Sequence, residues 1–237
     1  MIRAARERLE ERQREADAAR GRFEGDGRKP HDGDGNPKSG GTYARDFGVP
    51  APKAQENFTD PDSRIMKRSG GGFDYCYNAQ AAVDDTAHII VAAELGNSGS
   101  NAGKLAPMLD AVHTVMGKHP EQVLADARYR SESVFEQLQG HPTELIVALG
   151  HDEGKAQVRI DPQRRPLTAA MAAKFRLPET QQSYRRRKWL SEPPNGWIKN
   201  VLGFRQFSMR GLAKAQAEWK LVCAALNPRR MAKLATA

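Results

Sequence analysis

The sequence is poor in cysteine and in aromatic residues. It has only two cysteines, Cys76 and Cys223, in 237 residues. Two cysteines cannot build the dense disulfide framework of a small secreted domain, so we expect a reducing compartment, the cytoplasm. Aromatic residues make up 7% of the chain and apolar residues 39%. This composition provides enough material for one hydrophobic core, but not for a core that extends along the whole length.

Long apolar runs and metal-binding spacings are absent as well. No run of about 18 apolar residues occurs, which argues against a transmembrane helix and a membrane partner. The N-terminus lacks the apolar core of a signal peptide, since it reads MIRAARERLEER. The six histidines are scattered and no Cys-x-x-Cys or His-x-x-x-His pair occurs, so we expect no structural zinc.

Positive charge is concentrated towards the C-terminus. The chain has a formal net charge of +8, and residues 180–237 hold twelve Lys and Arg against only Glu192 and Glu218. A basic block of this density attracts polyanions, and nucleic acid is the default one. A solvated basic face without a partner is the alternative, but interleaved aromatic residues favour nucleic acid. The predicted DNA-binding residues are Arg185, Arg186, Arg187, Lys188, Lys199, Arg205 and Arg210.

The first 56 residues differ in composition from the rest. Residues 2–23 are rich in Ala, Glu and Arg, which favour a helix, and Leu9 is nearly the only large apolar residue among them. We therefore expect an exposed charged helix over residues 1–23. Residues 24–56 are rich in Gly, Pro, Asp and Lys and predict a disordered linker, because such a segment cannot offset its ordering entropy. The folded domain is expected over residues 57–237.

Strand and helix periodicities alternate through the middle of the chain. Strands are expected at 75–83, 88–93, 123–125 and 145–148. Helices are expected at 103–117, 131–138, 167–176, 180–192 and 209–226. The first two strands flank a turn at residues 84–86 and predict a hairpin, while Pro193, Pro194 and Pro228 are expected to kink or end the last two helices. The alternation predicts an α/β fold with a mixed sheet flanked by helices.

Two acids stand where metal chemistry would need them. Asp126 ends an apolar strand, and the carboxyl ends of strands line the functional crevice of α/β sheets; an ordinary turn-capping Asp is the alternative. Glu192 lies inside the basic block, four and seven residues after Lys188 and Arg185, so all three share a helix face. A salt-bridged surface Glu is the alternative there. Carboxylates that converge on Mg²⁺ are the usual machinery of phosphodiester cleavage.

Several long strings of the sequence, in the same order, resemble bacterial insertion-sequence transposases of the DDE type. The resemblance covers roughly residues 55–230, and the charged helix and linker before it suit the same proteins. The strings that carry the resemblance are NFTDPDSRIMK (57–67), GGFDYCYNAQAAVDD (71–85), VLADARYRSE (123–132), YRRRKWLSEPPNGWIKNVLGFRQFSMRGL (184–212) and AEWKLVCAALN (217–227).

The resemblance implies an RNase H-like catalytic domain. Three acids there bind two Mg²⁺ or Mn²⁺ ions, nick the transposon ends and join them to target DNA. Asp126 falls on the family's second Asp and Glu192 on its Glu, so these two are the implied catalytic and metal-binding residues. No string like the one around the family's first Asp precedes Asp60. The resemblance thus implies a C-terminal fragment without the first strand and first Asp, and Asp84 at the hairpin is the remaining candidate for that ligand.

Three functional hypotheses remain open at this stage. The first is a truncated DDE transposase that is inactive by itself because its first catalytic Asp is missing. The second is a non-catalytic DNA-binding fragment that regulates an intact transposase. The third is a chain that does not fold stably, because loss of a central strand exposes sheet edges. Arg128, Asn101 and Pro228 depart from the family pattern. The expected partners are double-stranded DNA and a second copy or an intact transposase, at the nucleoid in the cytoplasm.

Overall fold

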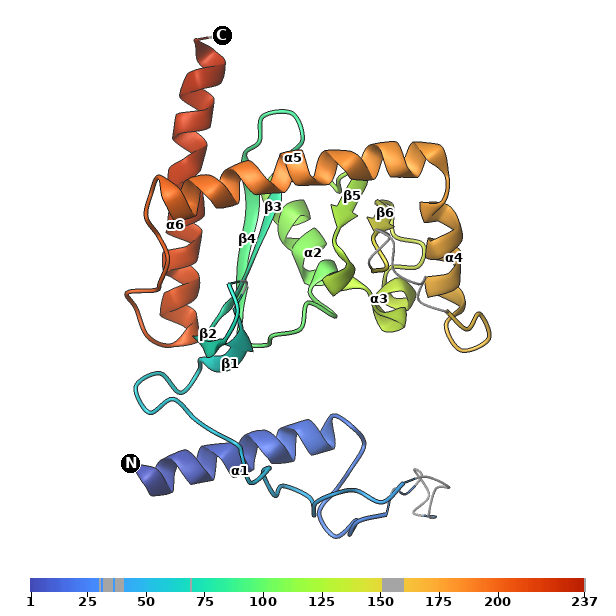
Figure 1. The fold of residues 1–237 in the computed structure, drawn as a ribbon, viewed down its shortest axis with the longest axis vertical. Helices are drawn as coiled ribbons and strands as arrows, with labels where there is room; N and C mark the ends of the chain where they lie inside the picture. The colour runs from blue at the N-terminus through green and yellow to red at the C-terminus, as the bar shows by residue number, and fades with distance from the viewer. Residues whose placement is uncertain (30, 32–35, 37–40, 69, 151–159, 237) are drawn as a thin grey trace. The chain divides into compact units, whose positions relative to one another are not determined.

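The computed structural model describes residues 1–29, 31, 36, 41–68, 70–150 and 160–236 (Figure 1). The chain divides into two compact units, Met1–Arg64 and Ile65–Ala237. Each unit is described by itself below. The expected domain boundaries at residues 23 and 56 stay predictions, and the structure draws its own boundary after Arg64.

The first unit is held together by charged groups. Its helix α1 spans Ile2–Ala18 and is five residues shorter at its end than expected. Glu56, whose side chain is 1% exposed, accepts hydrogen bonds from Arg8 and Arg12, each at 2.6 Å. Asp17 is also buried, pairs with Arg22 at 3.3 Å and accepts a hydrogen bond from the Gly48 amide.

Part of the expected linker therefore lies against α1 in an ordered arrangement. The guanidinium of Arg22 also stacks on the ring of Tyr43, 3.9 Å from its centroid. A buried ion-pair network supplies contacts there that apolar side chains would normally supply. The disordered linker over residues 24–56 stays a prediction. Residues 30, 32–35 and 37–40 of the expected linker lie outside the described residues.

The second unit combines short strands with longer helices (Figure 1). Its strands are β1 (Arg64–Lys67, which begins at the unit boundary), β2 (Phe73–Cys76), β3 (Asn78–Val83), β4 (Ile90–Gly96), β5 (Gln122–Ala125) and β6 (Glu144–Val147). Its helices are α2 (Leu105–Met116), the 3-10 turn η1 (Ala127–Tyr129), α3 (Glu132–Gln137), α4 (Pro166–Phe175), α5 (Pro178–Asn200) and α6 (Leu212–Ala235). The α/β class expected from the sequence is confirmed.

The strands of the described residues pair two by two. Strands β1 and β2 form one pair, β3 and β4 a second and β5 and β6 a third, instead of one continuous mixed sheet. β3 and β4 are antiparallel with Gln80 opposite Glu94, which is the expected hairpin. β5 and β6 are parallel, with Ala125 opposite Val147. The expected absence of a first RNase H-like strand stays a prediction.

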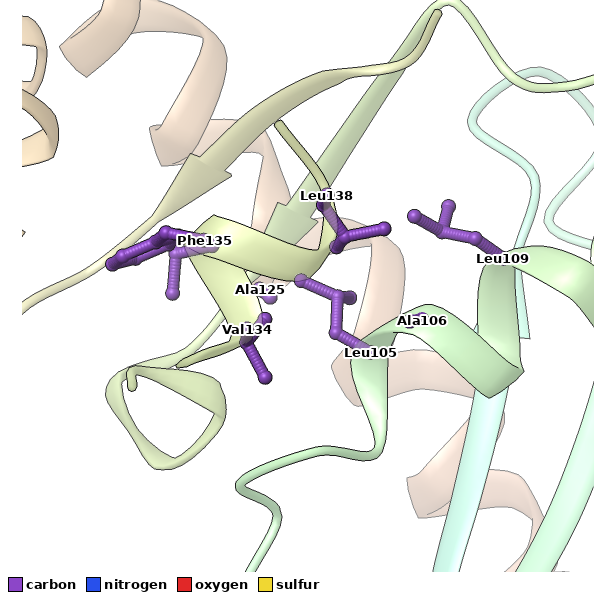
Figure 2. Close-up of a cluster of buried hydrophobic side chains, with 8 residues drawn as sticks. Leu105, Ala106, Leu109, Ala125, Val134, Phe135 and Leu138 are labelled. Atoms are coloured by element: carbon purple, nitrogen blue, oxygen red, sulfur yellow. The ribbon is translucent and has the colours of Figure 1, made fainter. Parts of the chain in front are cut away.

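The main core lies between α2, α3 and the β5–β6 pair. Leu105 and Leu109 of α2 point towards Val134 of α3 and Leu138, which directly follows α3 (Figure 2). Strand β5 contributes Ala125 to the same cluster. These helix residues recur every three or four positions, so the periodicity that predicted α2 also identified its buried face. The carboxyl end of β5 is therefore anchored by a packed core.

Helix α6 packs along β4 and builds a second cluster. Trp219, Val222 and Cys223 contact Ile90 and Ala93 there. Its polar side chains also satisfy strand backbone. Asn227 accepts a hydrogen bond from the Ile90 amide and donates one to the Ile90 carbonyl, both at 2.9 Å. The side-chain amide of Asn227 thus pairs with the N–H and the C=O of Ile90, as the backbone of a neighbouring strand would. Both backbone groups of Ile90 therefore have hydrogen-bond partners.

Both predictions about the internal prolines are wrong as to where the helices end. α5 continues through Pro193 and Pro194 to Asn200, and α6 continues through Pro228 to Ala235. A proline removes one backbone donor and costs about 3 kcal/mol in a helix interior. In α5 one stripe next to the prolines is buried, since Leu190, Pro194 and Ile198 face the rest of the unit. Tertiary packing therefore outweighs the local preference.

Candidate nucleic-acid interface and acidic residues

Asp126 lies at the carboxyl end of β5, as expected. Its side chain is half-buried and its Oδ1 accepts a hydrogen bond from the Arg128 amide at 2.9 Å. The Tyr129 amide donates to the Asp126 carbonyl at 3.1 Å and closes the turn η1. One carboxylate oxygen of Asp126 is therefore used to cap its own turn, as in the capping alternative raised by the sequence.

A buried polar network ties this turn to β3. The hydroxyl of Tyr129 donates a hydrogen bond to Oε1 of Gln80. Gln80 is buried, and its Nε2 donates to Asn78 Oδ1 at 2.8 Å and to Asn101 Oδ1 at 3.3 Å. Burial, assisted by the charge of Asp126, raises the pKa of Tyr129 to about 12, so the hydroxyl stays a donor at neutral pH.

Sequence reasoning did not single out this network. Gln80 shares the inward face of β3 with Asn78 and Ala82, and its burial is the feature that matters. The indole Nε1 of Trp219 adds a hydrogen bond to the Gln80 carbonyl at 2.9 Å. A Gln in an otherwise apolar alternation was the available clue, because a buried amide needs partners.

Asp84 directly follows β3 and closes the hairpin. Its carboxylate accepts hydrogen bonds from the backbone amides of Thr86 at 3.1 Å, Ala87 at 2.9 Å and Ile89 at 3.2 Å. Burial alone would raise the pKa of Asp84, but these three amides outweigh it and lower the pKa below its ordinary value. His88 in the same turn has a φ of 57°, which such a tight turn requires. The carboxylate thus has an evident structural role.

Glu192 is exposed, on the stripe of α5 opposite the buried one. The buried stripe contains Leu190, Pro194 and Ile198, spaced by four residues. Glu192 lies two residues from Leu190, which is more than half a helical turn round the axis. The exposed stripe also carries Arg185, Lys188 and Lys199, as the sequence spacing predicted. We call Arg185, Lys188 and Lys199 the basic row.

The three candidate acids do not form a metal site in this arrangement. Within the described ranges, no group of three or more His, Cys, Asp or Glu side chains is placed to hold a metal ion. Asp84 and Asp126 both use carboxylate oxygens to cap their own turns, and Glu192 is exposed on α5. A two-ion site for Mg²⁺ or Mn²⁺ requires carboxylates that converge, and the described residues show no such three-ligand group. Their catalytic and metal-binding roles stay predictions.

The predicted DNA-binding residues separate into two groups. Arg186 forms an ion pair with Asp85 of the hairpin at 2.6 Å, and the half-buried Arg187 lies 5.5 Å from the ring centroid of Tyr184. Arg186 therefore attaches α5 to the hairpin, whereas Arg187 contacts a ring of its own helix. The remaining residues are exposed: Arg185, Lys188, Lys199, Arg205 and Arg210.

A second contact fixes the same part of α5. Trp189 lies edge-on to His88, with ring centroids 4.3 Å apart. Together with the pair between Arg186 and Asp85, it ties α5 to the 84–89 turn. α5 also contacts α4, α6 and β5 (Figure 1). The basic row is therefore presented by a helix that is held at several points along its length.

Comparison with known proteins gives one family. The family model described as the transposase DDE domain matches residues 46–227, which is more than three quarters of the chain. No curated protein and no solved structure matches the chain. Among the described residues, no helix is both long enough and apolar enough to cross a membrane.

Proposed function

Because the chain belongs to the family of transposase DDE domains, we propose that it acts on double-stranded DNA in transposition and that the basic row holds the DNA. The observation that carries this proposal is the exposure of Arg185, Lys188 and Lys199 along one stripe of α5. These residues span 14 positions, or about 21 Å of helix. A rigid row of this length can follow a phosphate backbone without reading its sequence.

The neighbouring residues support the same surface. Arg205 and Arg210 are exposed in the segment between α5 and α6, and the Arg205 guanidinium donates to Asn200 Oδ1 at 2.9 Å. This contact holds Arg205 next to the carboxyl end of α5, close in sequence to Lys199. We assign both arginines to the same DNA-binding surface, with the transposon end and the target DNA as its ligands.

The second part of the proposal concerns cleavage. We propose that this chain nicks and joins DNA weakly or not at all by itself; in support, the described residues contain no group of three or more His, Cys, Asp or Glu side chains placed to hold a metal ion. Asp126 and Glu192 remain the family's matching acids by resemblance. The functional role that follows is DNA binding at insertion-sequence ends, alone, with a second copy or beside an intact transposase whose activity the chain would modulate.

A binding experiment tests the first part. The purified chain, the variant Arg185→Ala/Lys188→Ala/Lys199→Ala and the control Arg3→Ala/Arg6→Ala/Arg164→Ala are titrated into a fluorescent DNA duplex. The control removes three exposed charges elsewhere. We expect the row variant to lose roughly tenfold or more in affinity and the control to change little. Equal losses in both variants would refute the basic row.

A nicking experiment tests the second part. Supercoiled plasmid is incubated with the chain and Mg²⁺ or Mn²⁺, beside the Asp126→Ala variant. We expect no nicking above background from either protein. Robust nicking that disappears with Asp126→Ala would show that the acids do converge when DNA is bound, and the proposal of weak activity would be wrong.

A further inference from the structure

Three histidines that lie far apart in the sequence contact one another in the second unit. His113 is in the last turn of α2, His119 precedes β5, and His141 lies between α3 and β6. The rings of His113 and His119 are stacked, with centroids 4.1 Å apart and an angle of 13°. His141 meets His119 edge-on at 4.6 Å. We call these three residues the histidine stack.

Hydrogen bonding identifies the protonation state that this packing accommodates. Nδ1 of His119 is buried and has no hydrogen-bond partner among the described residues. Nδ1 of His141 accepts a hydrogen bond from the Thr143 amide at 3.1 Å. A proton on Nδ1 of His119 would be a buried N–H without an acceptor, and a proton on Nδ1 of His141 would face the N–H of Thr143. Either arrangement costs stability. The packing therefore accommodates His119 as a neutral imidazole.

The stack is located where the parallel strand pair begins. His119 is three residues before β5, and Thr143 immediately precedes β6. The Glu144 amide donates to the Glu121 carbonyl at 2.8 Å in the same region. The stack thus joins the end of α2 to the start of both strands, and the other end of β5 leads into the Asp126 turn.

We propose that the histidine stack is an acid-sensitive contact that holds the start of the β5–β6 pair only while its imidazoles are neutral. Protonation of two neighbouring rings would place like charges about 4 Å apart, where they repel. The groups that act on His119 are His113 and Asp110 from α2 and His141 from the α3–β6 segment. Asp110 opposes the other two but does not cancel them.

The direction of the pH effect follows from these contacts. Burial, and then the charges of His113 and His141, lower the pKa of His119 below its ordinary 6.5. The unfolded chain therefore binds a proton at His119 more readily than the folded chain does. The stability contributed by the neutral ring is complete above about pH 6.5 and is lost as the pH falls below that value. This inference does not depend on DNA binding.

Urea unfolding of the full chain at pH 7.5, 6.5 and 5.5 tests the proposal, beside the variant His119→Phe. Phenylalanine keeps an aromatic ring in the stack and cannot titrate, and the buried Nδ1 that it replaces makes no hydrogen bond. As the pH falls below 6.5, we expect the unfolding equilibrium constant of the native chain to rise more steeply than that of His119→Phe. The difference amounts to up to about tenfold per pH unit. Equal pH dependence of the two proteins would overturn the proposal.

A second measurement keeps the test decisive if the variant does not fold. The ring protons of the histidines are followed by NMR between pH 8 and 5 on the isotopically labelled native chain. His119 titrating clearly below 6.5 supports the proposal. His119 titrating at or above 6.5 contradicts it, because the packed ring would then accept a proton as easily as a solvated one.

Discussion

Glu192 lies on the same exposed stripe of α5 as the basic row, between Lys188 and Lys199. A carboxylate at that position would repel the phosphates that the basic row is proposed to bind. The family resemblance assigns it to metal binding, but a metal site would require other acids close by, and the described part of the chain brings none into a three-ligand group. If the basic row holds DNA as proposed, we expect Glu192 to weaken DNA binding.

The variant Glu192→Gln tests that reading. It removes one negative charge with little change in shape. We expect DNA affinity in the presence of EDTA to rise about two- to fivefold, the range of one surface charge interaction. The measurement is fluorescence anisotropy at low salt, with the exposed Glu179→Gln in the first turn of α5 as the control. A fall in affinity for Glu192→Gln would contradict the reading.

Asp84 offers a prediction about acid stability. Its pKa is lowered by three backbone amides, so the stability it contributes is present above the unfolded pKa of about 4 and is lost as the pH falls through the lower folded pKa. Asp84→Ala removes the acceptor of those amides and should cost about 1 kcal/mol at pH 7, the usual value of a lost cap.

The measurement is urea unfolding of the native chain and the variant at pH 7 and pH 3. The gap between the two proteins should shrink at pH 3, where the native carboxylate is partly protonated. Asp85→Ala is the neighbouring control, since its carboxylate pairs with Arg186 rather than with the turn amides. An undiminished gap at pH 3 would mean that the charge of Asp84 is not what closes the turn.

At the scale of elements, α6 raises the question of how a helix continues through proline. Pro228 is exposed and lies one residue after Asn227, whose amide holds Ile90 of β4. Arg230, just beyond the proline, donates to the Ala87 carbonyl at 3.0 Å. Contacts on both sides of Pro228 therefore fix the helix direction, although the backbone hydrogen bond of that residue is missing.

Pro228→Ala restores the missing donor and removes the clash of the ring. If α6 runs through residue 228, the variant should be more stable than the native chain by up to about 3 kcal/mol. The measurement is the urea midpoint together with the helical signal in circular dichroism. No gain in either would indicate that the helix stops at Asn227, as local propensity predicts.

At the scale of the whole molecule, the sequence was most informative where local pattern and packing agree. The β3–β4 hairpin follows from alternation and α2 from a period of 3.6, and α2 buries the face that its pattern defines. In β3, by contrast, the alternating residues Ala79 and Ala81 are exposed and Gln80 between them is buried. The ends of α5 and α6 could not be predicted, because tertiary contacts of Ile198 and Asn227 decide them. The contacts of residues 41–56 with α1 depend on buried charges, which composition alone does not reveal.

In the candidate site, too, local spacing predicts some features and contacts between distant residues decide the others. The position of Asp126 after a strand and the shared stripe of Glu192, Lys188 and Arg185 follow from spacing alone. Which arginines attach α5 and which remain exposed depends on partners that are distant in sequence, such as Asp85 for Arg186. The histidine stack is also invisible in the sequence, since its three rings come from separate segments.

We propose that Arg185, Lys188 and Lys199 contact DNA phosphates, and the salt dependence of DNA binding reports how many such contacts form. Each phosphate contact contributes about 0.9 to the slope of log affinity against log salt. Between 50 and 200 mM salt, the variant without the basic row should therefore show a slope smaller by about 2.7, while Arg3→Ala/Arg6→Ala/Arg164→Ala keeps the native slope. An unchanged slope in the row variant would contradict the account.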